Sequence, residues 1–188
     1  MAQSRDLDYY SVAAKTSEVR IFQIALHQGQ VKGLEKAMAM TSHKREVLSV
    51  AYDSSQSGKY CATTAKDQCV IVYALDSHFK QAKLLIAQEI ASLSELTLSS
   101  LCVVEKFSTQ KPVAYVALAE GSTFEVYSGV IAADGEIKQL SSVIRVTEAQ
   151  QDAIQQIELF FDTGKEELYL LTSAKLDHRL NIWRVPTD

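Results

Sequence analysis

The chain has 188 residues, of which 47% are hydrophobic and 22% are charged, and its formal net charge is −4. This composition is typical of one globular domain with a sizeable core, and it excludes disordered and collagen-like chains as well as a protein drawn to polyanions by a general positive field. The mean hydropathy of −0.04 and the lack of a long apolar run argue against a membrane-spanning helix, and no hydrophobic segment follows the N-terminus to form a secretory signal. We therefore expect an intracellular protein, cytoplasmic or nuclear, that does not act at a membrane.

Four similar segments follow one another along the chain, and each contains two β-type runs joined by a tight turn. The paired runs are 10–13 with 19–22, 60–62 with 70–73, 113–117 with 124–127, and 168–171 with 180–183. Each second run ends in an aromatic residue, at intervals of about 50 to 56 residues: Phe22, Tyr73, Tyr127 and Trp183. Six residues before each aromatic stands a residue type compatible with a turn: Thr16, Asp67, Gly121 and Asp177. Each segment is therefore expected to contain a hairpin.

An earlier apolar run precedes the hairpin in three of the segments, at 47–52, 101–104 and 154–161. A further strand is expected in the more variable stretch after the aromatic residue. A four-stranded antiparallel unit repeated at such an interval is typical of a β-propeller blade. We therefore predict an all-β chain of about three to four four-stranded blades. It forms a single region over 1–188, with approximate units 9–42, 43–91, 92–146 and 147–188.

The predicted strands are too few for a closed ring. The first unit lacks its initial strand and the last lacks its final strand, so about 14 strands are expected where a ring of four full blades needs about 16. The chain is then part of a longer propeller, a short chain that pairs with another propeller segment, or a fold that opens into a curved stack of sheets. Unpaired strand edges at the open end would favour a partner chain.

Three stretches have a helical alternative. Residues 80–90 contain strong helix formers, Thr147 could cap a short helical turn over 148–154, and the connection 25–40 is ambiguous. For residues 80–90 we favour an outer strand, because the repeat requires one there and tertiary context overrides propensity. The other two alternatives stay open.

The three cysteines, Cys61, Cys69 and Cys102, lack the spacings of a disulfide framework or a zinc site. If residues 66–68 form a hairpin turn, Cys61 lies opposite Tyr73 and too far along the ladder from Cys69 for a disulfide. We expect all three to be small, buried apolar residues in a reducing compartment.

Residues 43–75 resemble one repeat of the WD40 family. His43 stands at the histidine of the family's Gly-His pair, Asp67 at its hairpin aspartate, and Tyr73 at the tryptophan of its Trp-Asp pair, six residues after the aspartate. Ala65 replaces the hydroxyl residue that the family usually has two positions before the aspartate. The resemblance therefore implies a WD40-like blade whose hydrogen-bonded network is incomplete.

Residues 154–183 resemble a second repeat, with Asp177 and Trp183 at the same spacing, whereas the segments ending at Phe22 and Tyr127 keep the aromatic and lose the aspartate. An aspartate in a tight turn accepts backbone N–H groups, and a large aromatic fills the space between neighbouring blades. We therefore expect structural roles for seven positions: His43, Asp67, Tyr73, Asp177, Trp183, Phe22 and Tyr127.

The sequence gives no support to a catalytic, metal or cofactor site. His43, Asp67 and the many serines suggest a Ser-His-Asp triad, but there is no G-x-S-x-G elbow and the repeat assigns both residues to the frame. Residues 177–179, Asp-His-Arg, lack metal-ligand spacing and are expected in a solvated turn, and the glycines form no phosphate-binding loop. The basic run 43–45 suits ordinary solvated loop charge, so any contact with nucleic acid would be indirect.

The resemblance implies a non-catalytic protein–protein interaction scaffold or adaptor, a subunit of a larger multiprotein complex. We expect variable stretches such as 25–42 and 76–94 to supply recognition. The alternative is an accessory, non-catalytic subunit of an RNA-modifying enzyme such as a tRNA methyltransferase, because 57–60 and 70–73 would fit the non-catalytic subunit of tRNA guanine-N7 methyltransferase. An independent hydrolase is the least favoured interpretation.

Overall fold

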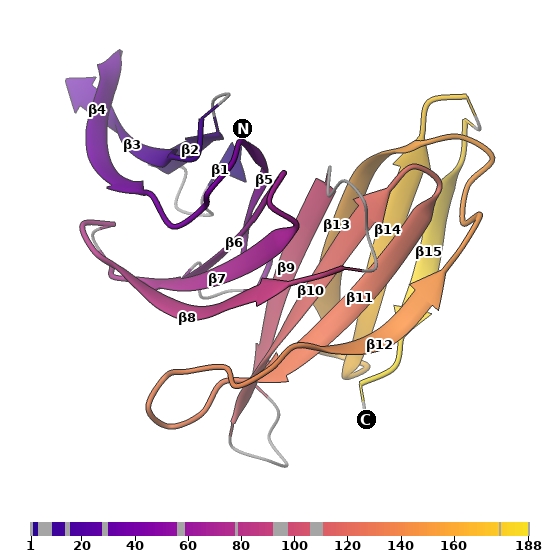
Figure 1. Ribbon diagram of the computed structural model, residues 1–188. Coiled ribbons are helices and arrows are strands. Elements are labelled where there is room, and N and C mark those ends of the chain that lie inside the picture. Colours follow the sequence, from indigo (N-terminus) through magenta and orange to yellow (C-terminus); the bar gives the residue numbers. More distant parts are fainter. Residues whose placement is uncertain are drawn as a thin grey trace.

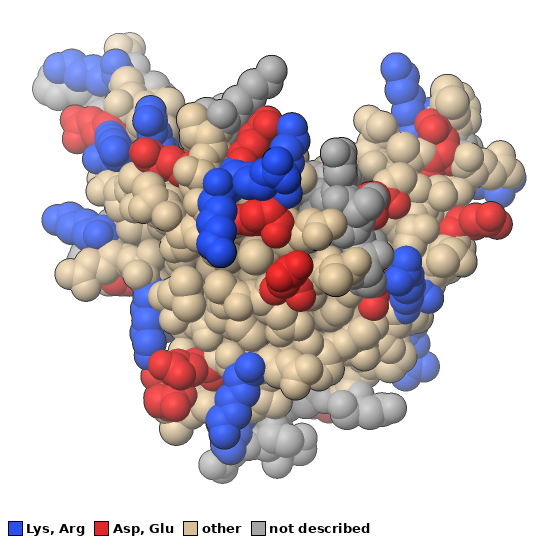
Figure 2. Space-filling model, in the orientation of Figure 1, with Lys and Arg blue, Asp and Glu red and all other residues tan. Residues whose placement is uncertain are grey.

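The computed structural model describes residues 2–3, 9–13, 16–27, 30–55, 59–77, 79–91, 98–105, 111–176 and 178–187. Every regular element in these residues is a β-strand, and the fifteen strands form four antiparallel sheets. Figure 1 shows the sheets following one another along an arc that stays open between the first and the fourth. Figure 2, in the same orientation, shows a notch between the two arms at the top of the view. The predicted all-β architecture of antiparallel sheets is confirmed.

The strands follow chain order within each sheet, with four strands in each of the first three sheets and three in the fourth. The first sheet contains β1 (Ala2–Gln3), β2 (Tyr9–Ala13), β3 (Val19–His27) and β4 (Gln30–Met40). The second contains β5 (Val47–Tyr52), β6 (Tyr60–Ala65), β7 (Cys69–Leu75) and β8 (Ala82–Glu89). The third contains β9 (Leu98–Glu105), β10 (Pro112–Glu120), β11 (Thr123–Val130) and β12 (Ser141–Val146). The fourth contains β13 (Ile154–Asp162), β14 (Glu167–Ala174) and β15 (Leu180–Val185).

The strand that the sequence pattern missed is β1. We expected the first unit to lack an initial strand, but β1 pairs antiparallel with β2, with Ala2 opposite Ser11 and Gln3 opposite Tyr10. A strand of two residues is too short to show an alternation of apolar and polar side chains. The expected count of 14 is therefore one short of the strands found in the described residues, whereas the fourth sheet has three strands as predicted.

None of the three stretches with a helical alternative is helical where the structure describes it. Within 80–90, residues 82–89 form β8, as favoured, and the described residues of 25–40 form the end of β3 and all of β4. Residues 147–152 form turns. Pairing of β8 with β7 satisfies its backbone in the sheet, so tertiary context overrides helix propensity here. The described part of the chain contains no helix that is long and apolar enough to cross a membrane.

The β6–β7 hairpin shows how a turn fixes the register of a sheet. The backbone N–H of Gln68 donates to the carbonyl of Ala65 at 3.1 Å, and Gln68 has a φ of 59°. This is the three-residue loop in which a type I turn is followed by a residue in the left-handed region. The turn places Cys61 opposite Tyr73, as predicted.

The cysteines are free and differ in burial. Cys61 and Cys102 are buried, and burial raises the pKa of the Cys61 thiol to about 12. Cys69 is only half-buried, so the expectation that all three are buried was wrong for this residue. The reason is its position directly after the turn, at the start of β7.

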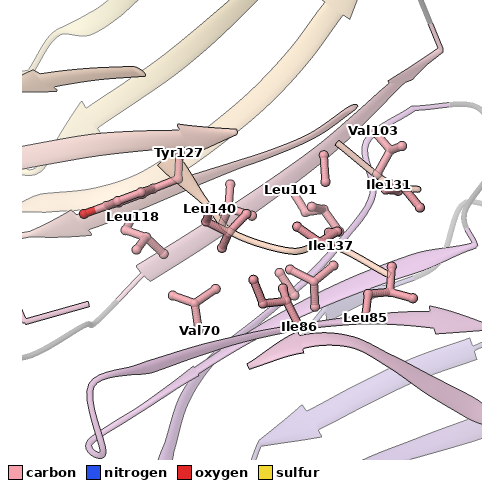
Figure 3. Close-up of a cluster of buried hydrophobic side chains, with 14 of the residues drawn as sticks. Val70, Leu85, Ile86, Leu101, Val103, Leu118, Tyr127, Ile131, Ile137 and Leu140 are labelled. Atoms are coloured by element: carbon pink, nitrogen blue, oxygen red, sulfur yellow. The ribbon is translucent and has the colours of Figure 1, made fainter. Parts of the chain in front are cut away.

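The sheets pack face to face through three buried apolar layers, one between each pair of neighbouring sheets. Figure 3 shows the layer between the second and third sheets, where Val70 lies near Leu118 and Ile86 lies near Ile137. Side chains alternate between the two faces of a strand, so Val70 and Val72 enter this layer while Ile71 enters the layer toward the first sheet. Each middle sheet therefore contributes to two cores, and a single strand connects them.

The innermost strands of neighbouring sheets are tied together by side chains that accept backbone hydrogen bonds. The buried carboxylate of Asp53, after β5, accepts the N–H of Val103 on β9 at 2.8 Å. The hydroxyl of Ser100 on β9 accepts the N–H of Leu159 on β13 at 2.8 Å. These bonds hold the sheets at fixed spacing along the inner edge of the arc.

At the outer edge, the connection between β11 and β12 closes the gap between the second and third sheets. The side-chain amide of Gln88 on β8 donates to the carbonyl of Leu140 at 2.9 Å and accepts its N–H at 2.7 Å. The N–H of Ile137 donates to the carbonyl of Leu85 at 3.1 Å. The connection passes so close to β11 that a Cβ on Gly129 would lie 2.6 Å from Ile137 Cγ2, which explains the glycine.

Candidate functional site

Three of the predicted aromatic residues lie on the face that their sheet presents to the preceding sheet. Tyr73 belongs to the layer between the first and second sheets, and Tyr127 to the layer between the second and third. Trp183 packs against the layer between the third and fourth sheets and meets the ring of Phe124 edge-on, with 5.2 Å between centroids. In each case the aromatic fills the space between two sheets.

Phe22 stands on the equivalent face of the first sheet. Its neighbour Ile21 points into the layer toward the second sheet, so the alternation of β3 turns Phe22 to the outward face. Phe22 is half-buried, because no other sheet of the described residues covers this face. Its surroundings therefore differ from those of the other three aromatics for a positional reason.

His43 and Asp67 lie together with Thr63 in a buried hydrogen-bonded network. His43 Nε2 lies 2.8 Å from Thr63 Oγ1, and His43 Nδ1 lies 3.2 Å from Asp67 Oδ1. The Asp67 carboxylate also accepts the backbone N–H groups of Lys44 at 2.8 Å and of Cys69 at 3.1 Å. The network therefore ties the connection before β5 to the turn between β6 and β7.

The expectation that this network is incomplete was wrong. Ala65 carries no hydroxyl, but Thr63, two residues earlier on β6, is fully buried and supplies one to His43. The hydroxyl of Tyr73 also hydrogen-bonds with Thr63 and with Ser42, and burial raises the pKa of this phenol. The network thus has a polar aromatic end, although tyrosine replaces the usual tryptophan.

The fourth sheet carries a similar network that the sequence analysis did not predict. Trp183 Nε1–H donates to the hydroxyl of Thr172 at 2.9 Å, and the Gln150 side-chain amide donates to the same hydroxyl at 3.0 Å. Gln150, in the connection before β13, holds the place that His43 holds before β5. A search for histidine misses it, and only its position before an initial strand could have indicated it. Asp177, which was expected to complete this repeat, lies outside the described residues.

The network orders a hydroxyl, an imidazole and a carboxylate as a catalytic triad does, but it is enclosed. Thr63 is fully buried and His43 is 6% exposed, so a substrate has no path to the hydroxyl. The Asp67 carboxylate also accepts hydrogen bonds from two backbone N–H groups. The arrangement therefore has a structural role in the second sheet.

In the described residues, no cluster of three or more His, Cys, Asp or Glu side chains could hold a metal ion.

Electrostatics assign the proton positions in this network. Burial lowers the pKa of His43 and outweighs the opposing effect of the Asp67 carboxylate, so the ring is neutral near pH 7. Burial raises the pKa of Asp67, but the N–H groups of Lys44 and Cys69 and the ring of His43 outweigh it, and the net pKa is lowered. With an ionised carboxylate at Nδ1, the neutral ring donates from Nδ1–H and accepts the Thr63 hydroxyl at Nε2.

We expect the stability of the protein to fall as the pH is lowered below about 6.5. The folded-state pKa of His43 lies below its ordinary value of 6.5, so the unfolded chain binds this proton more readily. The contribution is complete above 6.5 and is lost as the pH falls through the lower folded-state pKa. The lowered pKa of Asp67 acts in the same direction, below its ordinary value of 3.8. Thermal unfolding measured from about pH 8 to about pH 4 tests this profile.

The control for this prediction is His43→Gln, which keeps a polar side chain and cannot titrate. We expect this variant to be less stable at pH 8 and to lose less stability than the parent between pH 6.5 and about pH 5. A decline of equal steepness in both proteins would assign the effect to other groups.

The turns and connections at one end of the sheets make up what we call the turn face: residues 16–18, 41–46, 66–68, 121–122 and 147–153. Backbone hydrogen bonds join some of these connections across neighbouring sheets, for example Val47 N–H to Thr16 O at 2.9 Å and Ile154 N–H to Gly121 O at 2.8 Å. The turn face is therefore held rigidly by the sheets beneath it.

The charges on the turn face differ between its two halves. Lys44 and Arg45 are exposed beside the first two sheets, whereas Glu148 is exposed and Asp152 half-exposed beside the last two. On the side of the molecule in Figure 2, cations and carboxylates alternate without a large patch of one sign. Residues 25–42 and 76–94, which we expected to be variable recognition loops, contain the strands β4 and β8, so the expectation that they are loops was wrong there, and their role in recognition stays a prediction.

No protein-family model and no curated protein matches the sequence. Among solved structures, Sqt1 of Saccharomyces cerevisiae superimposes with a TM-score of 0.61 and 16% identity, over 97% of this chain and 43% of that chain. The β-propeller domain of Cps50 (Swd1) of Myceliophteria thermophila superimposes with a TM-score of 0.59 and 12% identity, over 99% of this chain and 54% of that chain. The chain thus spans about half the length of these structures, and the predicted fold of antiparallel β-propeller blades is confirmed.

Proposed function

We propose that this chain, an incomplete WD40-type β-propeller, is a non-catalytic interaction scaffold that binds other proteins on its turn face. The observation that carries the proposal is the use of His43, Thr63 and Asp67 in the frame, where burial keeps them from any substrate. A fold alone does not define a function, so the proposal depends on this site.

The turn face suits a protein partner because it is rigid and carries both signs of charge. Two exposed cations, Lys44 and Arg45, lie on one half, and Glu148 lies on the other. A partner with the opposite arrangement would be oriented by these charges, since complementary potentials fix register and raise association rates. Lys66 is paired with Glu46 at 2.7 Å, so it stiffens the basic half.

The state of the cysteines supports a cytoplasmic or nuclear setting for this scaffold. Cys61, Cys69 and Cys102 are free thiols, and disulfides are rare in reducing compartments. Two of these thiols are buried, which protects them from thiol–disulfide exchange.

We expect that reversing the charges of Lys44 and Arg45 weakens the binding of partner proteins to the turn face. The double variant Lys44→Glu/Arg45→Glu should recover them from native lysate at least about tenfold less well than the parent, a change of about 1.4 kcal/mol in binding. The matched control is Lys80→Glu/Lys165→Glu, which makes the same change of charge on exposed residues in the β7–β8 and β13–β14 connections. Quantitative mass spectrometry of the captured proteins gives the comparison.

Three outcomes of this experiment are informative. Equal losses in the two double variants would contradict the turn face as the binding surface. A catalytic RNA-modifying chain among the partners that only Lys44→Glu/Arg45→Glu loses would favour the accessory-subunit role. Turnover of a substrate by the purified chain would overturn the non-catalytic proposal.

A further inference from the structure

The outward face of the fourth sheet exposes side chains of the kind that the other sheets bury. Leu180 and Ile182 on β15 are each 61% exposed. On the same face, the rings of Phe160 and Tyr169 stack with 5.3 Å between centroids. The alternate residues of these strands pack toward the third sheet, so the apolar pattern of the fourth sheet is two-sided, as in a sheet with a neighbour on each face.

The outward face of the first sheet offers a matching apolar surface. Leu34 on β4 is 56% exposed and lies opposite the half-buried Ile24 on β3, and Phe22 lies two residues before Ile24. In the second, third and fourth sheets, the face that carries the corresponding aromatic is covered by the preceding sheet. The Phe22 face is therefore a surface of the type that receives another sheet.

The charges on the two outward faces are of opposite sign. On the first sheet, Arg20 and Lys36 share the single carboxylate of Glu18, at 2.7 Å and 3.7 Å. On the fourth sheet, three carboxylates, those of Glu158, Asp162 and Glu167, outnumber two cations: Arg184, which pairs with Glu167 at 2.8 Å, and Lys165, which lies over the ring of Tyr169. A net positive apolar face and a net negative apolar face suit each other better than either suits its own copy.

The extent of the arc indicates what completes it. The four sheets cover 43% and 54% of two propeller chains, and propeller rings contain up to about eight blades. We infer that two copies of this chain associate head to tail, the fourth sheet of each on the first sheet of the other, and close a ring of eight sheets. Such a contact joins two different surfaces and closes by two-fold rotation.

This inference rests on the proposed interaction role and names one partner within it, a second copy. It uses the end sheets, whereas the capture experiment uses the turn face, so each can fail without the other. Sedimentation equilibrium of the purified chain should give twice the mass of 20.8 kDa at micromolar concentration. Ile182→Glu should weaken the association at least about tenfold, because it would bury a carboxylate among the apolar side chains of the contact. Val130→Glu, the same change at a residue 51% exposed on the third sheet, should leave the two-chain mass unchanged.

A mixing experiment distinguishes the head-to-tail contact from a face-to-face one. Ile182→Lys and Leu34→Glu should each be monomeric alone, because a dimer of two identical variant chains would carry the substitution in both of its contacts. Mixed together they should form a two-chain species, because one contact is then wild type on both sides and the other sets lysine against glutamate. A monomeric parent at about 100 µM, a Leu34→Glu variant that stays dimeric, or assemblies longer than two chains would overturn the inference. Circular dichroism confirms that the variants, both at exposed positions, remain folded.

Discussion

Replacement of Leu118 by alanine is expected to lower the free energy of unfolding by about 2–5 kcal/mol. Leu118 lies on β10, a central strand of the third sheet, and its side chain is fully buried in the layer shared with the second sheet (Figure 3). Truncation removes buried methyl groups and leaves a cavity that the surrounding strands cannot fill, because their register is fixed by hydrogen bonds on both sides of β10. Urea unfolding followed by circular dichroism measures the loss.

The matched control is Leu84→Ala, the same truncation on β8 at a side chain that is 44% exposed. We expect it to cost less than about 1 kcal/mol, because little apolar area is returned to water. The Leu118 variant should also unfold in one transition, since each middle sheet contributes to two layers and cannot unfold alone. Similar losses for the two leucines, or two separate transitions, would contradict the shared cores.

The overall fold could be predicted because its determinants are local and repeat along the chain. The turn at 66–68 sets the β6–β7 register, and the alternation of Val70, Ile71 and Val72 sends side chains to two different layers. A sheet buried on both faces reads as a continuous apolar run, which is the pattern of Val70–Tyr73. Repetition of that run at a regular interval then indicated blades rather than an isolated hairpin.

The buried polar networks could not be predicted because their partners are distant in sequence and vary in type. Thr63 meets His43 across twenty residues, and Gln150 meets Thr172 across twenty-two. Either an imidazole or a carboxamide can donate or accept at this place, so a motif that requires histidine finds only one of the two networks. The face of the strand decides which hydroxyl takes part, because Thr63 and Thr64 are both fully buried and only the hydroxyl of Thr63 meets His43.

Two stretches that were expected to be loops contain strands instead, for a related reason. Variability along the sequence suggested residues 25–42 and 76–94 as loops, but outer strands are variable because one of their faces is exposed to solvent. On β8, the side chains of Lys83, Leu84 and Ala87 are accordingly exposed. The short connections of the turn face are held by backbone hydrogen bonds to neighbouring sheets, which a sequence pattern does not show.

Replacement of Asp67 by alanine is expected to lower the free energy of unfolding by about 2–4 kcal/mol, because an ionised acceptor of several hydrogen bonds is removed. The N–H groups of Lys44 and Cys69 and the Nδ1–H of His43 would lose their shared acceptor at once. His43 lies buried, so its N–H cannot turn to water without opening the connection before β5. Asp67→Asn keeps a carbonyl acceptor and loses the charge, so its loss should be intermediate.

The matched control for this prediction is Asp134→Ala, at an exposed turn aspartate whose carboxylate accepts the N–H of Glu136 at 3.0 Å. Water can replace that single bond, so we expect a loss of less than about 1 kcal/mol. Urea unfolding at pH 7 compares the three variants, and the order Asp67→Ala, Asp67→Asn, Asp134→Ala is expected from the largest loss to the smallest. If Asp67→Ala were as mild as Asp134→Ala, the network would be a consequence of the packing of β5 on β6 and not one of its causes.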